Sequence, residues 1–244
     1  MDVSPSRQKI LLLSSSKAGD SAYLAPCLAL IAEHCAARRI LFIPYAGVGM
    51  SQSDYTAKVR GALSETGLDV IGIETFADPL QAIAEAEAIM IGGGNTFQLL
   101  QQLYQQQLLV PIQQAVQRGI PYVGWSAGSN VAGLSIRTTN DMPIVEPPSF
   151  NALQLVPFQL NPHYSDYHPP GFHGETRDQR LAEFMTVAPT TPTLAIPEGT
   201  ALRIDGKHMT YISAEPAAYI FLGGNKQPIA AGSDCSQWLQ HSTQ

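Results

Sequence analysis

The chain has 244 residues, which is the size of one large α/β or barrel domain. Hydrophobic residues make up 45% of it and charged residues only 14%, so the composition is that of a folded globular protein and not of a disordered chain. With 14 Lys and Arg against 20 Asp and Glu, the net charge is −6, and the sequence lacks the basic stripe that binds a phosphate backbone. Nucleic acid is therefore not an expected partner.

Cysteine usage and the first apolar run indicate where the protein acts. The three cysteines, Cys27, Cys35 and Cys235, form no C-x-x-C pair and show no spacing typical of zinc or of a disulfide framework. The densest apolar run near the start, residues 11–13, is too short for a signal sequence or a membrane span. We therefore expect a cytoplasmic protein without a membrane partner.

Strands and helices alternate through the first half of the sequence. Short apolar runs typical of buried strands lie at residues 9–15, 39–47, 68–73, 88–92 and 120–124. Apolar residues at helical spacing separate them, at residues 22–38, 55–63, 80–87, 96–107 and 110–118. This alternation predicts an α/β fold with a mostly parallel central sheet flanked by helices.

The last hundred residues have a different pattern. Seven prolines interrupt residues 141–171, which predicts loops and short strands there. A helix is expected at residues 175–188, and strands are expected at 194–196, 201–204, 210–212 and 218–222, the later ones close enough together for hairpins. Since no repeat or linker divides the chain, we expect a single domain over residues 1–244, with a core at about 11–224 and a tail at about 232–244.

A nucleophile-elbow motif follows the apolar strand at residues 120–124. The segment Gly124-Trp125-Ser126-Ala127-Gly128 fits the pattern G-x-S-x-G and precedes a predicted helix at 127–132. Small flanking residues permit the strained turn that exposes the serine, and the helix directs backbone amides at the reacting oxygen. The alternative is an ordinary tight turn with an incidental serine.

A glycine-rich loop follows the strand at residues 88–92. Gly92, Gly93 and Gly94 stand before a predicted helix, so backbone amides there could approach a phosphate or an oxyanion closely. The phosphate-loop lysine is missing, and Phe97 stands where the dinucleotide fingerprint requires its third glycine. Because both glycine loops lie at the carboxyl ends of parallel strands, we predict an oxyanion hole beside Ser126.

A serine nucleophile needs a general base, and the sequence offers six histidines. His163 ends the apolar run at residues 155–164 and precedes a proline-rich loop, where residues of a sheet-edge site are expected. His168 and His173 lie in the same loop, so position alone favours His163 without deciding the matter. The remaining histidines are His34 on a predicted helix, His208 in a polar turn and His241 in the tail.

The carboxylate that orients the base has four candidates, Asp141, Glu146, Asp166 and Glu198. Asp141 and Glu198 each stand between a strand-like run and a turn. Either could instead cap a turn or pair with an arginine, and the residues alone do not separate them.

Five segments carry a resemblance to a known family. They are residues 91–100 (IGGGNTFQLL), 124–128 (GWSAG), 136–145 (IRTTNDMPIV), 161–163 (NPH) and 174–177 (GETR). Together they resemble peptidase E, the α-aspartyl dipeptidase family, and the similarity extends over about residues 11–224. The resemblance implies a fold similar to class I glutamine amidotransferases. It also implies hydrolysis of dipeptides that begin with aspartate, by a serine nucleophile and without a cofactor or metal. Whether the chain forms a homodimer is left open.

The resemblance assigns roles to the candidate residues. It implies that Ser126 is the nucleophile, His163 the base and Asp141 the acid that orients the base. Glu198 matches a family glutamate considered for the same role; the resemblance favours Asp141, and Glu198 is kept as a candidate for substrate binding.

Further residues are expected to contact the substrate. Backbone amides of Gly93, Gly94 and Ala127 are expected to form the oxyanion hole. Arg177 belongs to a family motif and is expected to bind the aspartyl carboxylate, with Arg137 as the alternative.

The loop at residues 165–172 is less similar to the family than the segments on either side of it, so the preference for the second residue of the dipeptide is undecided.

Three other functions remain open. A cyanophycinase-like enzyme that releases β-aspartyl-arginine shares the elbow. An esterase of the α/β-hydrolase type would use a late histidine such as His241, and a binding module could keep the glycine loops to sense a small acidic ligand.

Overall fold

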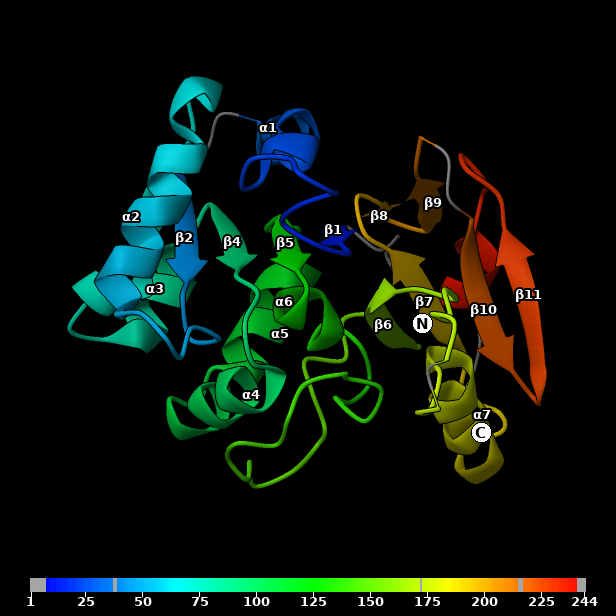
Figure 1. Cartoon of the computed structure of the whole chain (residues 1–244). Helices are drawn as coiled ribbons and strands as arrows, with labels where there is room; N and C mark the ends of the chain where they lie inside the picture. The colour runs from blue at the N-terminus through cyan, green and yellow to red at the C-terminus, as the bar shows by residue number, and fades with distance from the viewer. Residues whose placement is uncertain (1–7, 37–38, 172, 215–216, 241–244) are drawn as a thin grey trace, which may run out of the picture.

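The structure is a computed structural model that describes residues 8–36, 39–171, 173–214 and 217–240. Its larger sheet has seven strands in the order β3-β2-β4-β5-β1-β8-β9 (Figure 1). The first five in this order are parallel, while β8 pairs antiparallel with both β1 and β9. The bounds are β1 Lys9–Leu13, β2 Arg39–Ile43, β3 Asp69–Gly72, β4 Ala88–Ile91, β5 Tyr122–Trp125, β8 Ala201–Asp205 and β9 His208–Ile212.

Helices cover both faces of the parallel strands. One face packs against α1 (Leu28–Cys35) and α2 (Gln52–Ala62). The other packs against α3 (Pro79–Glu85), α4 (Thr96–Gln105), α5 (Leu109–Gln117) and α6 (Ala127–Asn130). Short 3-10 turns lie at Ala25–Cys27, Ser64–Thr66, Ile73–Thr75 and Ser236–Leu239.

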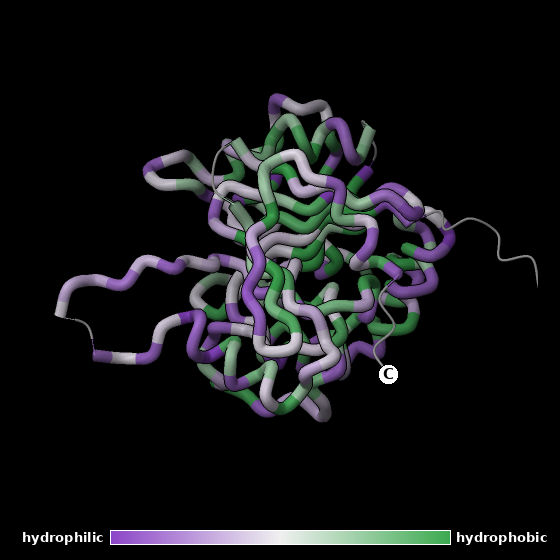
Figure 2. Tube along the Cα trace, turned by 90° about the vertical axis from the view of Figure 1, so that its right-hand side faces the viewer, coloured by the Kyte–Doolittle hydropathy of each residue, from purple (hydrophilic) through white to green (hydrophobic). Residues whose placement is uncertain are grey.

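Burial on both faces explains the unbroken apolar runs in the sequence. In β1, Ile10 and Leu12 join one core cluster, whereas Leu11 and Leu13 join the other. Successive side chains point to opposite faces, so a strand covered on both sides is apolar throughout. Figure 2 shows these strands as a hydrophobic interior and mostly hydrophilic segments around the outside. The predicted mostly parallel, helix-flanked sheet is confirmed.

A second sheet of four strands, in the order β11-β10-β7-β6, was not predicted. Its strands are β6 Gln159–Tyr164, β7 Thr193–Pro197, β10 Ala218–Leu222 and β11 Asn225–Ile229. β6 and β7 pair in parallel, with α7 (Arg177–Val187) between them in the sequence. The predicted hairpin is present at β8–β9, but the parallel connection from β6 through α7 to β7 was not predicted. This connection places the carboxyl ends of β6 and β7 side by side.

The ends of two predicted segments differ from expectation. The helix expected at 22–38 is shorter, because the turn Ala25–Cys27 contains Pro26 and α1 begins only at Leu28, while residues 37–38 lie outside the described residues. Part of the expected tail packs on β9, where the Cys235 amide donates to the Met209 carbonyl at 2.7 Å. His241 lies outside the described residues. No helix in the described part of the chain is long and apolar enough to cross a membrane.

Candidate active site

Ser126 occupies a strained turn between β5 and α6. Its backbone angles are φ 54° and ψ −115°, a combination that few residues other than glycine adopt without strain. Gly128 is required beside it, since a Cβ there would lie 2.1 Å from the Ile91 carbonyl oxygen. The strand, the strained serine and the helix appear in the order that the G-x-S-x-G motif predicts.

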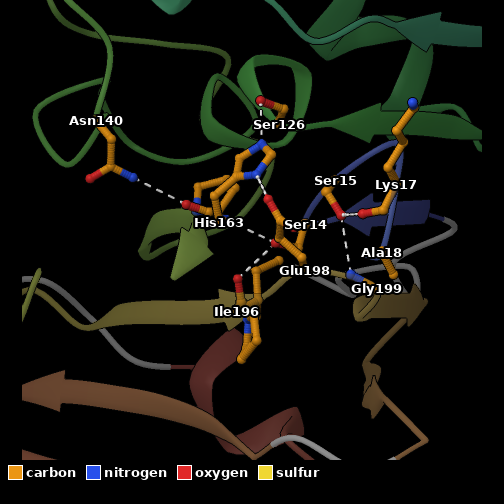
Figure 3. A network of polar contacts seen from close by, with 12 residues as sticks. Ser14, Ser15, Lys17, Ala18, Ser126, Asn140, His163, Ile196, Glu198 and Gly199 are labelled. Atoms are coloured by element: carbon orange, nitrogen blue, oxygen red, sulfur yellow. Dashed lines mark hydrogen bonds and ion pairs between the residues drawn. The ribbon is translucent and has the colours of Figure 1, made fainter. Parts of the chain in front are cut away.

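His163 sits at an irregularity near the end of β6. Its φ is 55°, and the pairing with β7 shifts register between Pro162 and Tyr164. The His163 amide donates to Ser14 Oγ at 2.9 Å, and Ser14 Oγ donates to the Ile196 carbonyl at 2.7 Å. Because the bulge interrupts the regular up-and-down alternation of side chains along β6, the His163 imidazole points toward Ser126 (Figure 3).

Ser126, His163 and Glu198 form a continuous chain of contacts (Figure 3). Ser126 Oγ is 2.9 Å from His163 Nε2, and Glu198 Oε1 is 2.7 Å from His163 Nδ1. An ionised carboxylate can only accept, so Nδ1 carries the proton and Nε2 is left to accept from the serine hydroxyl. This tautomer is the one that a general base needs.

Glu198 reaches His163 because of the parallel pairing of β6 and β7. Glu198 follows the last residue of β7, next to the strand end that carries His163. The Gly199 amide donates to Ser15 Oγ at 3.1 Å, which ties the turn to the end of β1. The side chains of His163 and Glu198 are 37% and 53% exposed, so the pair orients the imidazole without being sealed from water.

The structure does not bring Asp141 to the base, contrary to the role that the resemblance implied. Asp141 Oδ2 accepts from the Thr96 amide at 2.7 Å and from Thr96 Oγ1 at 2.5 Å. Thr96 is the first residue of α4, where unpaired amides and the helix dipole favour a carboxylate. Asp141 is therefore held at a helix N-terminus, and the carboxylate on His163 Nδ1 is that of Glu198.

The remaining candidate acids and bases lie away from the serine. Asp166 accepts from Tyr219 Oη at 3.3 Å, and Glu146 lines neither of the two cavities that contain Ser126. Among the described histidines, His163 alone contacts Ser126. His168 lines a cavity with Arg180, and His34 and His208 line a different one.

The glycine loop after β4 lies against the elbow. A Cβ on Gly93 would fall 2.9 Å from Ser126 Cβ, so this close approach requires glycine. Within the described residues, the amides of Gly93, Gly94 and Ala127 donate to no protein acceptor. Tyr55 Oη donates to the Gly93 carbonyl at 2.8 Å, and since that peptide is trans, the Gly94 N–H points away from Tyr55.

Arg177 lines a cavity of about 390 Å³ together with Ser126, His163 and Asp141; we call it the arginine cavity. Burial and the neighbouring Arg180 lower the pKa of the Arg177 guanidinium from its usual value, whereas the Asp141 charge opposes the shift. Arg137, the alternative anchor, is exposed and does not line this cavity.

A second cavity of about 490 Å³ adjoins the first and shares only Ser126 and His163 with it. Lys58, Tyr23, Met50 and the glycine loop also line it, and we call it the lysine cavity. In the described part of the chain, no group of three or more His, Cys, Asp or Glu residues is arranged to hold a metal ion.

Comparison with known proteins identifies the family. The sequence model of Peptidase family S51 matches residues 10–212. The chain belongs to peptidase family S51. Peptidase E of Shewanella baltica is 56% identical over 232 residues, covering 94% of this chain and 98% of that protein. Peptidase E of Shewanella amazonensis is 54% identical over 235 residues, covering 95% and 99%.

A solved structure supports the fold of this S51 peptidase. It is that of a peptidase from an acI-B1 actinobacterium, which matches with a TM-score of 0.69 at 16% identity. The alignment covers 93% of this chain and 96% of that one. The predicted family is thus confirmed, and the chain is a serine-type peptidase of family S51.

Proposed function

We propose that this S51 peptidase hydrolyses dipeptides with an N-terminal aspartate, using Ser126 as the nucleophile, His163 as the base and Glu198 as the orienting acid. The observation that carries the proposal is Arg177 in the same cavity as Ser126 and His163. An arginine binds a carboxylate through two parallel hydrogen bonds, which fixes the geometry of the bound group as well as its charge. Peptidase E is also the name of the relatives that match nearly the whole chain.

The charges in the arginine cavity complement an N-terminal aspartate. That residue carries a β-carboxylate and a free ammonium group. Arg177 would bind the β-carboxylate. Burial and the neighbouring Arg180 disfavour the charged form of the Arg177 guanidinium, and the negative charge of a bound carboxylate would stabilise that form. Asp141, bound to Thr96 through Oδ2, would accept from the ammonium group with its other oxygen.

The reaction then follows from the contacts around Ser126. Ser126 Oγ attacks the scissile carbonyl carbon while His163 Nε2 takes the hydroxyl proton. The amides of Gly93, Gly94 and Ala127 are the donors available to the oxyanion. As the C–N bond breaks, His163 returns the proton to the leaving amine. His163 then takes a proton from a water molecule, whose oxygen attacks the aspartyl ester, and gives that proton to Ser126 Oγ as the C–Oγ bond breaks. The Glu198 carboxylate stabilises the imidazolium in both halves of the reaction.

A substrate comparison tests the proposal. Purified protein is incubated with Asp-Leu, Asn-Leu, Glu-Leu and N-acetyl-Asp-Leu, and free leucine is measured. Asp-Leu should be cleaved at least about a hundredfold better in kcat/KM than Asn-Leu, because a neutral side chain leaves the guanidinium unpaired. Release of arginine from β-Asp-Arg at a higher rate than of leucine from Asp-Leu would overturn the assignment.

A further inference from the structure

The lysine cavity contains a charged residue, Lys58, to which the proposed reaction gives no role. It is lined by Ser126 and His163, yet among the described residues its only lysine or arginine is Lys58, and no described aspartate or glutamate lines it. Lys58 Nζ lies 4.2 Å from the centroid of the Tyr23 ring. Lys58 is exposed, and no carboxylate partner of its ammonium occurs among the described residues, so the cavity has an uncompensated positive charge on its lining.

Packing connects Lys58 to the nucleophile. The Tyr23 ring beneath the ammonium meets the Trp125 ring edge-on, with centroids 6.4 Å apart. Trp125 stacks on Phe42 at 5.8 Å and directly precedes Ser126 in the chain. A cation over an aromatic face is attracted by the ring, which limits the freedom of the long lysine side chain. The charge is therefore kept on the wall of the cavity.

The rim of the lysine cavity is apolar. Val48, Met50 and Ile144 line it and remain 60%, 43% and 51% exposed, so they leave a group of apolar side chains open to solvent. Exposed apolar groups around a depression are typical of a binding surface. The cavity thus combines apolar contacts with one cation, the complement of an apolar amino acid that carries a free carboxylate.

We propose that Lys58 binds the α-carboxylate of the residue that leaves, with its side chain against Val48, Met50 and Ile144. This rests on the proposed function, in which Arg177 takes the aspartate into the arginine cavity. The leaving residue then occupies the other cavity, since both contain Ser126 and His163. A charge at this position favours a dipeptide over a longer peptide, whose next residue would replace the carboxylate by a neutral amide.

The test compares Asp-Leu with Asp-Leu-amide, which differ only in that charge. We expect the wild-type protein to prefer the acid by about tenfold in kcat/KM, mainly through KM. Lys58→Met should bring the ratio of the two kcat/KM values close to one, and Lys58→Arg should restore part of it. Lys207→Met is the matched control, because it removes an exposed lysine from the β8–β9 turn and should keep the ratio.

Two results would overturn the proposal, and they differ from failure of the proposed function. If Lys58→Met keeps the wild-type ratio, or if the wild-type protein cleaves both peptides equally, Lys58 does not bind the carboxylate. Hydrolysis of Asp-p-nitroanilide distinguishes failure of the Lys58 proposal from failure of the proposed function. This compound has an N-terminal aspartate for the arginine cavity, but its leaving group carries no carboxylate for Lys58 to bind. If the wild-type protein cleaves neither this compound nor Asp-Leu, the aspartyl dipeptidase assignment is wrong, and the role of Lys58 falls with it.

Discussion

Glu198 lies 2.7 Å from His163 Nδ1 although 35 positions separate them in the chain. Strands β6 and β7 run in parallel beside each other, so residues at their carboxyl ends meet. The bulge at His163 then aims Nε2 at Ser126 while Nδ1 faces Glu198. One crossover and one bulge are therefore enough to bring a serine, a histidine and a glutamate together from three separate segments.

Glu198→Gln should lower kcat by about a hundredfold or more with little change in KM. The amide oxygen can still accept from Nδ1, but the negative charge that stabilises the imidazolium is lost. Steady-state kinetics on Asp-Leu measure the effect, and circular dichroism checks that the fold is kept. The side chain is more than half exposed, so folding should be unaffected.

Asp141→Asn is the comparison for Glu198→Gln. Because Asp141 contacts Thr96 and lines the arginine cavity, its charge should matter for binding the ammonium group and not for the base. We expect a raised KM for Asp-Leu with a smaller loss in kcat. A fall in kcat larger than that of Glu198→Gln, at unchanged KM, would instead make Asp141 the acid.

Ser126→Ala should remove hydrolysis by several orders of magnitude while the fold is retained. Alanine lacks the oxygen that attacks the substrate, and it is smaller than serine at the same backbone angles. A fluorophosphonate probe provides an independent measurement, since it should label the wild-type protein at Ser126 and leave the variant unlabelled. Labelling of the variant at another serine with retained turnover would contradict the assignment.

The sequence motifs pointed to Ser126 and His163, which lie in contact in the structure, but they did not decide which carboxylate lies beside His163. The elbow is encoded within five neighbouring residues, and its strand is unbroken and apolar. The choice between Asp141 and Glu198 depends on which strand lies beside β6, a long-range pairing that periodicity does not report. One signal was available: the helix predicted between two strands at residues 175–188 is typical of a parallel crossover.

Arg177→Met should abolish the preference for Asp-Leu over Asn-Leu. Methionine has a similar length but no charge, so the β-carboxylate loses its partner. Arg177 is partly buried, so the loss should be smaller than the roughly 3–5 kcal/mol of a fully buried pair. The ratio of kcat/KM values should fall toward one. Arg180→Met is the matched control, because Arg180 lies one turn further along α7, is 53% exposed and does not line the arginine cavity. Should Arg177→Met keep the full preference, Arg177 does not bind the β-carboxylate.

The thiols of Cys27 and Cys235 should resist alkylation in the folded protein. Burial raises the pKa of both thiols to about 11, so at pH 7.5 nearly all of each remains in the protonated, unreactive form. Iodoacetamide should leave activity unchanged, and labelling should increase only as the pH approaches 11 or when guanidinium unfolds the chain. Rapid inactivation at pH 7.5 with label on Cys27 would show that a thiol contributes to the site.

Tyr55→Phe should lower kcat by about tenfold to a hundredfold, with a small change in KM. Tyr55 Oη is the donor to the Gly93 carbonyl, and this bond fixes the direction in which the Gly94 N–H points. Without it the glycine loop can rotate, so a donor to the oxyanion is lost mainly in the transition state.

Tyr104→Phe is the control for Tyr55→Phe. Tyr104 Oη also donates to a backbone carbonyl, that of Asn151 at 2.9 Å, but it lines neither cavity around Ser126. Each variant should lose about 1 kcal/mol of unfolding free energy, because each leaves a carbonyl without its donor. Only Tyr55→Phe should lose activity on Asp-Leu at a temperature where both variants are folded. Equal activity in the two variants would mean that the glycine loop holds its conformation without Tyr55.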